Sequence, residues 1–542
     1  MQIESNIIDI DKKTIYPACI SIKDTKISDI KKIDKKLSTY ILPGFIDAHI
    51  HIESSMLPPS EFAKLAVKHG TVATVSDPHE IANVLGVKGV DFMIENGKQS
   101  GFKFFFGASP CVPATPFETN GATLTPTIIE KLLLRDDIYF LSEVMNFPGV
   151  INSDKDIMDK IALSKKYKKP IDGHAPGLRG EELDRYISAG ISTDHEAYML
   201  DEAKEKLDKG MKILIREGSA AKNFNALEPL IDKYYENLMF CSDDRHPNDL
   251  QKEHINSFVK KSLEKKHDLF KVLQIACINP IKHYKLNVGM LKKGDFADFI
   301  EIDTIENFNI LKTFINGKKV YEDKEAKLRK VQVTPINNFN TTTKKQSDFY
   351  IRREHKKYRV IRAIDGELLT EKEVFQIKKG ETSLVMPDID RDILLISVIN
   401  RYKNSKPALS FVKGFGIKEG AIALSVAHDS HNIISVATNY EDLTKAVNLV
   451  IKNKGAIAVV RGEEEHILPL EIAGLMSTLR GDEVAEKYEF LNKIVKEMGS
   501  NLKSPFMTLS FMALLVIPKL KIGDLGLFDV EKFKFTDIYL ED

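Results

Sequence analysis

The stretch Pro43-Gly-Phe-Ile-Asp-Ala-His-Ile-His-Ile-Glu53 decides the fold, because it combines a strand pattern with two residues of a metal-ligand type. Side chains of a strand alternate between its two faces, so Asp47, His49 and His51 are expected to point the same way. Two imidazoles presented together at a strand end form half of a site for a divalent metal ion. A single His-x-His can occur by chance, so this interpretation depends on where the other potential ligands fall.

Eight strand-like segments, beginning with this one, alternate with segments whose pattern predicts helices. The strand-like segments cover residues 45–51, 71–77, 102–108, 138–144, 170–174, 191–195, 212–216 and 238–242. Eight strands within about 240 residues are the size expected of a TIM barrel. We therefore predict an α/β fold with a (β/α)8 barrel as its catalytic part.

Potential metal ligands fall at the C-terminal ends of several predicted strands, the face on which barrel active sites are assembled. Glu143 closes the fourth strand and His174 the fifth. His195 closes the sixth, and Asp243 follows the eighth. With the pair on the first strand, the predicted metal ligands are His49, His51, Glu143, His174, His195 and Asp243.

These positions resemble the amidohydrolase superfamily, whose motifs include His-x-His after strand 1, histidines after strands 5 and 6, and an Asp after strand 8. Other motifs resemble its adenine deaminase branch, namely Ser76-Asp-Pro-His-Glu80, Ser109-Pro-Cys-Val-Pro-Ala114, Ser142-Glu-Val-Met-Asn146, Asp172-Gly-His-Ala-Pro176, Ala427-His-Asp-Ser-His-Asn432 and Leu468-Pro-Leu-Glu-Ile-Ala-Gly-Leu-Met476. The resemblance implies a hydrolase that removes the 6-amino group of adenine, giving hypoxanthine and ammonia in purine salvage. It extends over nearly the whole chain.

The residue at the end of the fourth strand bears on the number of metal ions. Many two-metal relatives bridge their ions with a carboxylated lysine at this place, but here the residue is Glu143, and no lysine occurs in residues 141–150. A glutamate can span two ions with its two oxygens, and the resemblance implies a binuclear centre. Single-metal relatives that resemble cytosine deaminases place a Glu shortly after the His of strand 5, whereas Glu181 lies seven positions after His174. We expect two divalent ions, with Mn favoured over Fe or Zn.

The expected reaction assigns roles to three residues. Asp243 is predicted to act as the base that takes a proton from water and passes it towards the leaving amine. His195 is expected to hold the second metal and to help orient the attacking oxygen. Asp77 follows the second strand and is predicted to contact a ring nitrogen or a proton in transfer. Its alternative role is the N-cap of a helix that begins with Pro78.

Four further residues are candidates for contact with the substrate. Glu80 follows the second predicted strand, and Cys111 lies in a proline-rich loop after the third. That loop either lines a purine pocket or is a rigid surface loop. His428 and His431 belong to a polar cluster in the C-terminal part, which is either an exposed turn or a segment that closes over the barrel mouth.

Composition excludes several classes of protein. Of the 542 residues, 43% are hydrophobic and 29% are charged, which is a globular balance. Lys+Arg and Asp+Glu both number 78, so the basic surplus of a nucleic-acid binder is missing. The N-terminus lacks the pattern of a signal peptide, and no apolar run is long enough to cross a membrane. The four cysteines are scattered without a Cys-x-x-Cys pair. We expect a cytoplasmic enzyme that forms a homodimer or a larger assembly.

The remaining chain predicts two further domains. Strand-like patterns on both sides of the barrel predict one small β-sandwich from residues 1–44 and 285–330, which leaves residues 45–284 as the barrel. Polar residues 331–347 predict a linker. Residues 348–542 predict a separate α+β domain, with strands at 392–400, 421–427, 433–437 and 456–460 and helices at 440–453, 468–479 and 482–498.

Two other functions fit part of these observations. Another amidohydrolase, acting on a cyclic amide or an N-acyl substrate as dihydroorotases and deacetylases do, would need the same metal ligands. A scaffold protein that has kept the barrel and lost catalysis would be expected to lose ligands first. All six predicted ligands are present, which argues against the scaffold.

Overall fold

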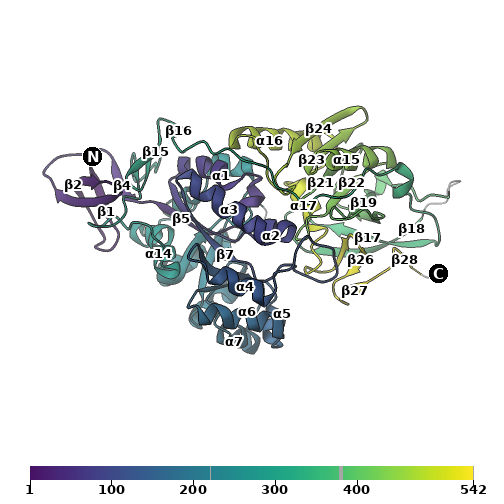
Figure 1. Ribbon diagram of the computed structural model, residues 1–542, viewed down its shortest axis with the longest axis horizontal. Helices are drawn as coiled ribbons and strands as arrows, with labels where there is room; N and C mark the ends of the chain where they lie inside the picture. The colour runs from purple at the N-terminus through teal and green to yellow at the C-terminus, as the bar shows by residue number, and fades with distance from the viewer. Residues whose placement is uncertain (220, 378–382, 541–542) are drawn as a thin grey trace. The chain divides into compact units, whose positions relative to one another are not determined.

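A computed structural model describes residues 1–219, 221–377 and 383–540, and the chain divides into two compact units (Figure 1). Unit 1 consists of Met1–His79, Asp91–Cys111 and Leu124–Val333. Unit 2 consists of Glu80–Val90, Val112–Thr123 and Thr334–Asp542. The segments that follow the second and third barrel strands therefore pack with the C-terminal part of the chain.

Eight parallel strands form the barrel of unit 1. They are β5 (Phe45–Ile50), β6 (Thr71–Ser76), β7 (Lys103–Ala108), β8 (Ile138–Val144), β9 (Ile171–Gly173), β10 (Thr193–Asp194), β11 (Lys212–Arg216) and β12 (Leu238–Cys241). They pair in the order β5-β6-β7-β8-β9 and β10-β11-β12. The amide of Ser192 donates to the carbonyl of Ile171 between the two sheets, and a parallel bridge between Ile50 and Asp243 joins the other edges. All eight predicted strands and the predicted barrel are confirmed.

Short helices connect these strands. In unit 1 they include α1 (Pro59–Ala66), α4 (Pro126–Leu133), α5 (Phe147–Ile151), α6 (Lys155–Lys166), α7 (Gly180–Ser188), α8 (Leu200–Asp208), α9 (Phe224–Leu227), α10 (Ile231–Tyr234), α11 (Pro247–Lys252), α12 (Ile255–Glu264), α13 (Leu269–Leu273) and α14 (Asn279–Tyr284). Two more, α2 (His79–Leu85) and α3 (Val87–Ser100), contain the residues at which the chain passes between units. In the part of the chain that the structure describes, no helix is both long enough and apolar enough to cross a membrane.

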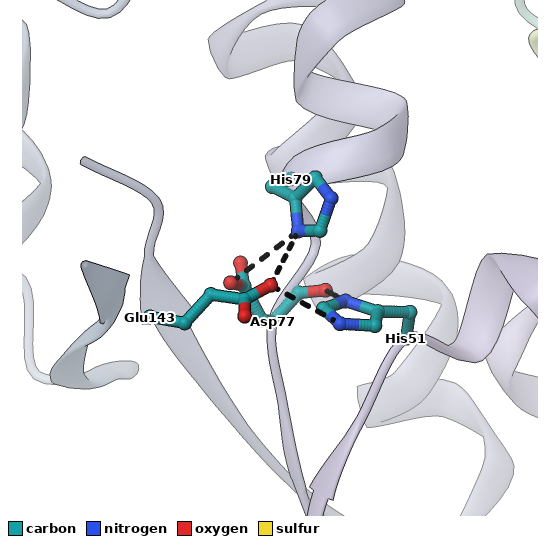
Figure 2. A group of neighbouring side chains, drawn as sticks. All are labelled: His51, Asp77, His79 and Glu143. Carbon is teal, nitrogen blue, oxygen red and sulfur yellow. Dashed lines mark hydrogen bonds and ion pairs between the residues drawn. The ribbon is translucent and has the colours of Figure 1, made fainter. Parts of the chain in front are cut away.

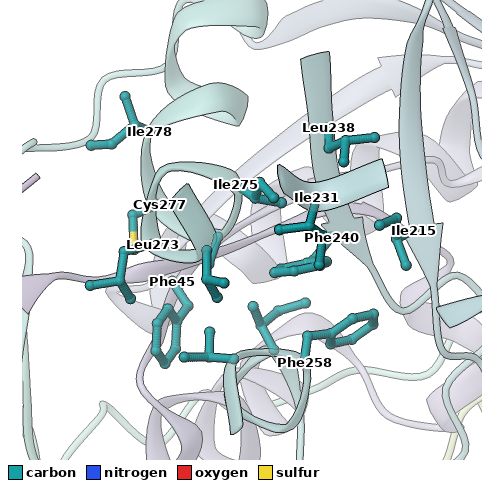
Figure 3. Packing of buried hydrophobic residues seen from close by; sticks show 14 of the residues in the cluster. Phe45, Ile215, Ile231, Leu238, Phe240, Phe258, Leu273, Ile275, Cys277 and Ile278 are labelled. Atoms are coloured by element: carbon teal, nitrogen blue, oxygen red, sulfur yellow. The ribbon is translucent and has the colours of Figure 1, made fainter. Parts of the chain in front are cut away.

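Strands buried on both faces explain the nearly continuous apolar runs of the sequence. Phe240 of β12 packs against Phe258 of α12 with ring centroids 4.8 Å apart, and both side chains are fully buried. Phe45 of β5 and Ile215 of β11 belong to the same cluster, which Figure 3 shows between the strands and the helices that cover them. This core fixes the strand ends that carry the polar residues.

Strands from both flanks of the barrel form one eight-stranded sheet in the order β16-β15-β14-β13-β4-β1-β2-β3. Their bounds are β1 (Gln2–Asp9), β2 (Thr14–Lys23), β3 (Lys26–Lys32), β4 (Tyr40–Pro43), β13 (Phe299–Ile302), β14 (Ile310–Ile315), β15 (Lys318–Glu322) and β16 (Glu325–Ala326). The flanks meet where β4 pairs antiparallel with β13. Strands from both flanks therefore share one sheet, as expected, although the sequence pattern did not reveal β1; their division from the barrel as a separate β-sandwich domain stays a prediction.

Unit 2 is built mostly of strands. Its main sheet contains β17 (Lys357–Ala363), β18 (Thr370–Gln376), β19 (Leu394–Ile399), β20 (Ala408–Lys413), β21 (Ala421–Leu424), β22 (Ile433–Ala437), β23 (Ala456–Arg461), β24 (Glu464–Pro469) and β28 (Tyr539–Leu540). A smaller sheet contains β25 (Leu520–Gly523), β26 (Gly526–Asp529) and β27 (Lys534–Phe535). The longer helices are α15 (Tyr440–Lys452), α16 (Gly481–Glu497) and α17 (Pro505–Phe511). The predicted α+β class is confirmed.

The helix predicted at residues 468–479 is wrong. Strand β24 continues to Pro469, and the chain then turns through Ala473 and Gly474, both with positive φ. A Cβ on Gly474 would lie 2.1 Å from the guanidinium of buried Arg401. The close approach of that side chain, which no local pattern reveals, determines the turn.

Replacement of Phe240 by alanine tests the packing of the barrel core. We expect Phe240→Ala to lower the free energy of unfolding by about 3–5 kcal/mol, because it leaves a cavity that the neighbouring strands cannot fill. Urea denaturation followed by circular dichroism measures the loss. Phe490→Ala is the control, since that side chain is 51% exposed. Equal losses for the two variants would contradict the assignment of Phe240 to the core.

Candidate metal centre

The six predicted ligands converge at the C-terminal end of the barrel. His49 lies in β5, and His51 follows its last residue; Glu143 lies near the end of β8. His174 and His195 each follow directly after a short strand, and Asp243 comes two residues after β12. His174 is partly exposed, and the other five are buried. The structure therefore brings all six residues together.

Glu143 is the central carboxylate of this group. Its Oε1 lies 3.3 Å from Nε2 of His51. Its Oε2 lies 2.7 Å from Nδ1 of His174 and 3.2 Å from Nε2 of His195. The two oxygens of one side chain thus face imidazoles from opposite parts of the barrel.

Asp243 faces the first-strand histidines with one oxygen and an arginine with the other. Its Oδ1 lies 3.4 Å from Nε2 of His49 and 3.2 Å from Nε2 of His51. Its Oδ2 accepts a 2.6 Å hydrogen bond from Nη1 of Arg216, and the same guanidinium binds Glu196. The sequence analysis missed both Arg216 and Glu196. Arg216 ends the seventh strand and Glu196 follows a predicted ligand, so charged residues at buried strand ends were the available signal.

Asp77 and His79 extend the group around Glu143, as Figure 2 shows. Nδ1 of His79 lies 3.4 Å from Oδ2 of Asp77 and 3.4 Å from Oε1 of Glu143. The other oxygen of Asp77 accepts a hydrogen bond from the hydroxyl of Ser109. His51 lies 3.1 Å from the backbone carbonyl of Asp77 through Nδ1. The sequence analysis gave His79 no role beyond its place in the motif Ser76–Glu80.

The geometry fits a divalent metal ion. Two sets of three residues each bring their candidate ligand atoms within 4.8 Å of one another. One set is His49, His195 and Asp243, and the other is Glu143, His174 and His195. Nε2 of His49 and Nε2 of His51 are only 3.2 Å apart, a distance that suits two nitrogens directed at one cation. Nε2 of His195 is buried, and the described residues offer it no hydrogen-bond partner, although Glu143 lies nearby. A cation would satisfy these nitrogens and oxygens together.

The carboxylates of the site are strongly acidic. Burial raises the pKa of Glu143, but His174, His195 and His51 outweigh burial and hold it well below the ordinary value. Burial also raises the pKa of Asp243, and Arg216 with the first-strand histidines reverses the shift. Both side chains are therefore ionised at neutral pH and can serve as metal ligands.

The pKa values of two neighbouring imidazoles are shifted upwards. Burial lowers the pKa of His174, but Glu196 and Glu143 outweigh it and raise the pKa to about 9. For His79, the lowering by burial and by His51 is exceeded by the effect of Asp77 and Glu143, which raises the pKa to about 10. Both imidazoles are therefore protonated at neutral pH, and their positive charges balance the carboxylates. A metal ion that binds to a protonated histidine must displace its proton.

Asp47 does not join the ligands, although the alternation of side chains placed it on their face. Its Oδ2 lies 2.8 Å from Nε2 of His254, and its Oδ1 accepts a hydrogen bond from the amide of Ser242. Asp47 thus ties β5 to the end of β12. His254 is therefore a structural partner of Asp47, and it also lies 2.7 Å from the hydroxyl of Thr71 through Nδ1.

The four candidate substrate residues lie in different units. Cys111 is a buried residue of unit 1, and burial raises the pKa of its thiol to about 12. Glu80, His428 and His431 belong to unit 2. There, Nδ1 of His428 lies 3.8 Å from Oε1 of Glu80, and the imidazole stacks on Phe511. Their contact with a substrate stays a prediction.

The barrel and its buried His/Asp/Glu cluster define an amidohydrolase, a class of metal-dependent hydrolases. Residues 40–320 match the model of the amidohydrolase family, and residues 367–534 match the adenine deaminase C-terminal domain. The chain belongs to the adenine deaminase family, as predicted from the sequence.

Three relatives illustrate the similarity, each covering 99% of both chains. Adenine deaminase from Sulfurovum sp. (strain NBC37-1) is 56% identical, that of Borreliella burgdorferi is 53% identical, and that of Methanosarcina mazei is 49% identical. Among solved structures, the β-aspartyl dipeptidase of Fervidobacterium islandicum AW-1 is 17% identical with a TM-score of 0.47, and the match covers 62% of this chain and 100% of that one.

Removal of the central carboxylate tests the metal centre. We expect Glu143→Ala to lose both metal ions, or to retain at most one weakly, because both oxygens of Glu143 face potential metal ligands. Metal analysis by mass spectrometry after gel filtration measures the stoichiometry. Glu130→Ala, which removes a carboxylate paired with Lys166, is the control and should keep the wild-type content. A Glu143→Ala protein with two tightly bound ions and near-normal turnover would contradict the assignment.

Proposed function

We propose that the protein hydrolyses the exocyclic C6–N bond of adenine, releasing hypoxanthine and ammonia in purine salvage. The similarity to relatives named adenine deaminase over 99% of the chain carries this proposal. The convergence of the six candidate ligands at the barrel end supports it, because a hydrolase of this class needs that set intact.

We propose that His49, His51, Glu143, His174, His195 and Asp243 hold two divalent ions. The two oxygens of Glu143, which face different histidines, support the number two. Imidazole and carboxylate ligands without thiolate suit Mn, Fe or Zn, and Mn is the first choice. Such ions, when bound, lower the pKa of coordinated water towards neutrality and so supply hydroxide.

The protein residues supply proton transfer and orientation. Asp243 takes a proton from the attacking water through Oδ1, the oxygen that faces His49 and His51, and delivers it towards the leaving amine. His195, whose Nε2 lies 3.2 Å from Oε2 of Glu143, would hold a metal ion and help to orient the attacking oxygen. Attack at C6 also requires that the neighbouring ring nitrogen accept a proton; the second proton of the water supplies it, while the first leaves with the amine. Asp77, fixed by Ser109 close to Glu143, is the proposed contact for that nitrogen.

Assembly and location are further proposals. A homodimer or a larger homo-oligomer is the default for enzymes of this kind. The four cysteines all carry free thiols, which supports the reducing environment of the cytoplasm.

Substrate comparison tests the proposed reaction. We expect the Mn-loaded protein to release ammonia from adenine and to leave adenosine unchanged, because the relatives are named for the free base. A coupled ammonia assay and chromatography of the bases measure both reactions. Dihydroorotate and an N-acetylated amino sugar serve as controls for the amide-hydrolase alternative. Rapid turnover of adenosine, or none of adenine with Mn, Fe or Zn, would refute the proposal.

The variant Asp243→Asn distinguishes the two proposed roles of Asp243, metal ligand and general base. An amide oxygen can still coordinate a metal, but it cannot accept a proton at neutral pH. We therefore expect the metal-loaded variant to bind adenine normally and to lose at least about 10²-fold in kcat. Metal content and rate must be measured on the same sample. Asp249→Asn, on a carboxylate of α11 that none of the six ligands contacts, should retain wild-type kcat. An Asp243→Asn rate within about fivefold of wild type would leave Asp243 a ligand only.

A further inference from the structure

Arg216 is a buried cation placed directly behind the proposed base. It ends strand β11, and only 5% of its surface is exposed. Nη1 donates to Oδ2 of Asp243 at 2.6 Å and also to Oε1 of Glu196, while Nη2 donates to Oε2 of Glu196 at 3.3 Å. The guanidinium therefore binds Glu196 with two nitrogens and Asp243 with one.

The backbone of Asp243 does not decide which oxygen faces the ligands. Its amide donates to the carbonyl of His49 and its carbonyl accepts from the amide of His51, so the position of the residue is fixed. The last torsion of an aspartate side chain, however, is broad and has two-fold symmetry. The bond from Arg216 breaks that symmetry, because it holds Oδ2 on the side away from the histidines.

Arginine suits this task better than lysine. A planar guanidinium can bind one carboxylate with two nitrogens and keep a fixed direction for a third hydrogen bond. Glu196 supplies the two-point contact that stops the guanidinium from turning. In addition, the amide of Arg216 donates to Oδ1 of Asn223, whose Nδ2 donates to the carbonyl of Ala197. Side chain and backbone of Arg216 are thus both held to the segment after His195.

We propose that Arg216, held by Glu196, is a positioning residue that leaves Oδ1 as the single oxygen of Asp243 available for proton transfer. This inference rests on the proposed function, in which Asp243 is the base. Without the guanidinium, Oδ2 of Asp243 is released, and Glu196, which keeps only its contacts with His174 and His195, repels it. Asp243 can then turn both oxygens towards the metal side. Metal binding then persists while the proton acceptor is misplaced.

The first experiment compares Arg216→Met with Arg245→Met in the full-length, Mn-loaded protein. Arg245 is a second buried arginine, and its guanidinium donates to Glu217 and Glu253 rather than to any candidate ligand. We expect Arg216→Met to keep its metal content and to keep KM for adenine within about threefold, while kcat falls at least about tenfold, since small misplacements of reacting groups cost up to about 10²-fold. Arg245→Met should keep kcat within about threefold of wild type. A normal kcat for Arg216→Met, or a loss of metal that accounts for its rate, would overturn the proposal.

A double-mutant cycle shows whether Arg216 acts through Asp243. If it does, adding Arg216→Met to Asp243→Asn should change kcat by less than about threefold, because the group that it positions is already disabled. Independent, multiplicative losses would overturn the proposal. Should Arg216→Met fail to fold, Arg216→Lys replaces it, as it retains the charge but lacks the planar fork. A wild-type kcat for the lysine variant would equally overturn the proposal.

A spectroscopic measurement tests the position of Asp243 independently of the proposed deamination of adenine. The full-length protein loaded with Co²⁺ should change its visible absorption in Arg216→Met at equal metal content, because a freed carboxylate alters the coordination of the ion. Arg245→Met should match wild type. If wild type does not deaminate adenine, the proposed function fails, and the spectrum still tests the position of Asp243. If adenine is deaminated but rate and spectrum are unaffected in Arg216→Met, the positioning role alone fails.

Discussion

The closure of the barrel between its first and last strands is the constraint on which the site depends. The amide of Asp243 donates to the carbonyl of His49 at 3.0 Å, and the carbonyl of Asp243 accepts from the amide of His51 at 3.2 Å. The same two backbone bonds that close the cylinder therefore set the first-strand pair against the carboxylate after β12. A slip of one residue would turn the side chains to the other face of the strand and dismantle the site. The hydrogen bond from the amide of Ser242 to the carboxylate of Asp47 adds a second link between these two strands.

The site also requires that its buried charges be balanced. Glu143, Asp243, Glu196 and Asp77 are buried carboxylates within one region, and removing such charges from water costs several kcal/mol per ion unless they are paired. Arg216 neutralises part of this charge permanently, through Asp243 and Glu196. The histidines supply the rest, and they can exchange a proton for a metal ion, which arginine cannot do. The site thus combines one fixed cation with cations that a metal can replace.

The barrel and its ligands could be predicted because they follow local rules. Apolar runs mark strands buried on both faces, and polar residues at their C-terminal ends face one mouth. Asp47, two residues before His49, was not among the predicted ligands, and its carboxylate contacts His254 and Ser242 instead. Arg216 and Glu196 were missed because their contact with each other and with Asp243 depends on how side chains from neighbouring strands are directed, which the sequence does not show. The turn at Gly474 depends on Arg401, which is distant in the sequence.

The two halves of the candidate centre are held by different means. His49 and His51 extend from a six-residue strand that bonds to neighbours on both sides. His174 and His195 follow strands of only three and two residues, which offer few ladder bonds. Near these two histidines, the buried Lys206 holds the chain in place. Its Nζ donates to the carbonyl of Ala175 at 2.7 Å and to Asp194 at 2.9 Å. Asp194 in turn accepts from the amides of Ala175 and Ala197, so one buried ion pair fixes the residues beside both histidines. Backbone pairing therefore defines the first half of the centre, and a side-chain network defines the second.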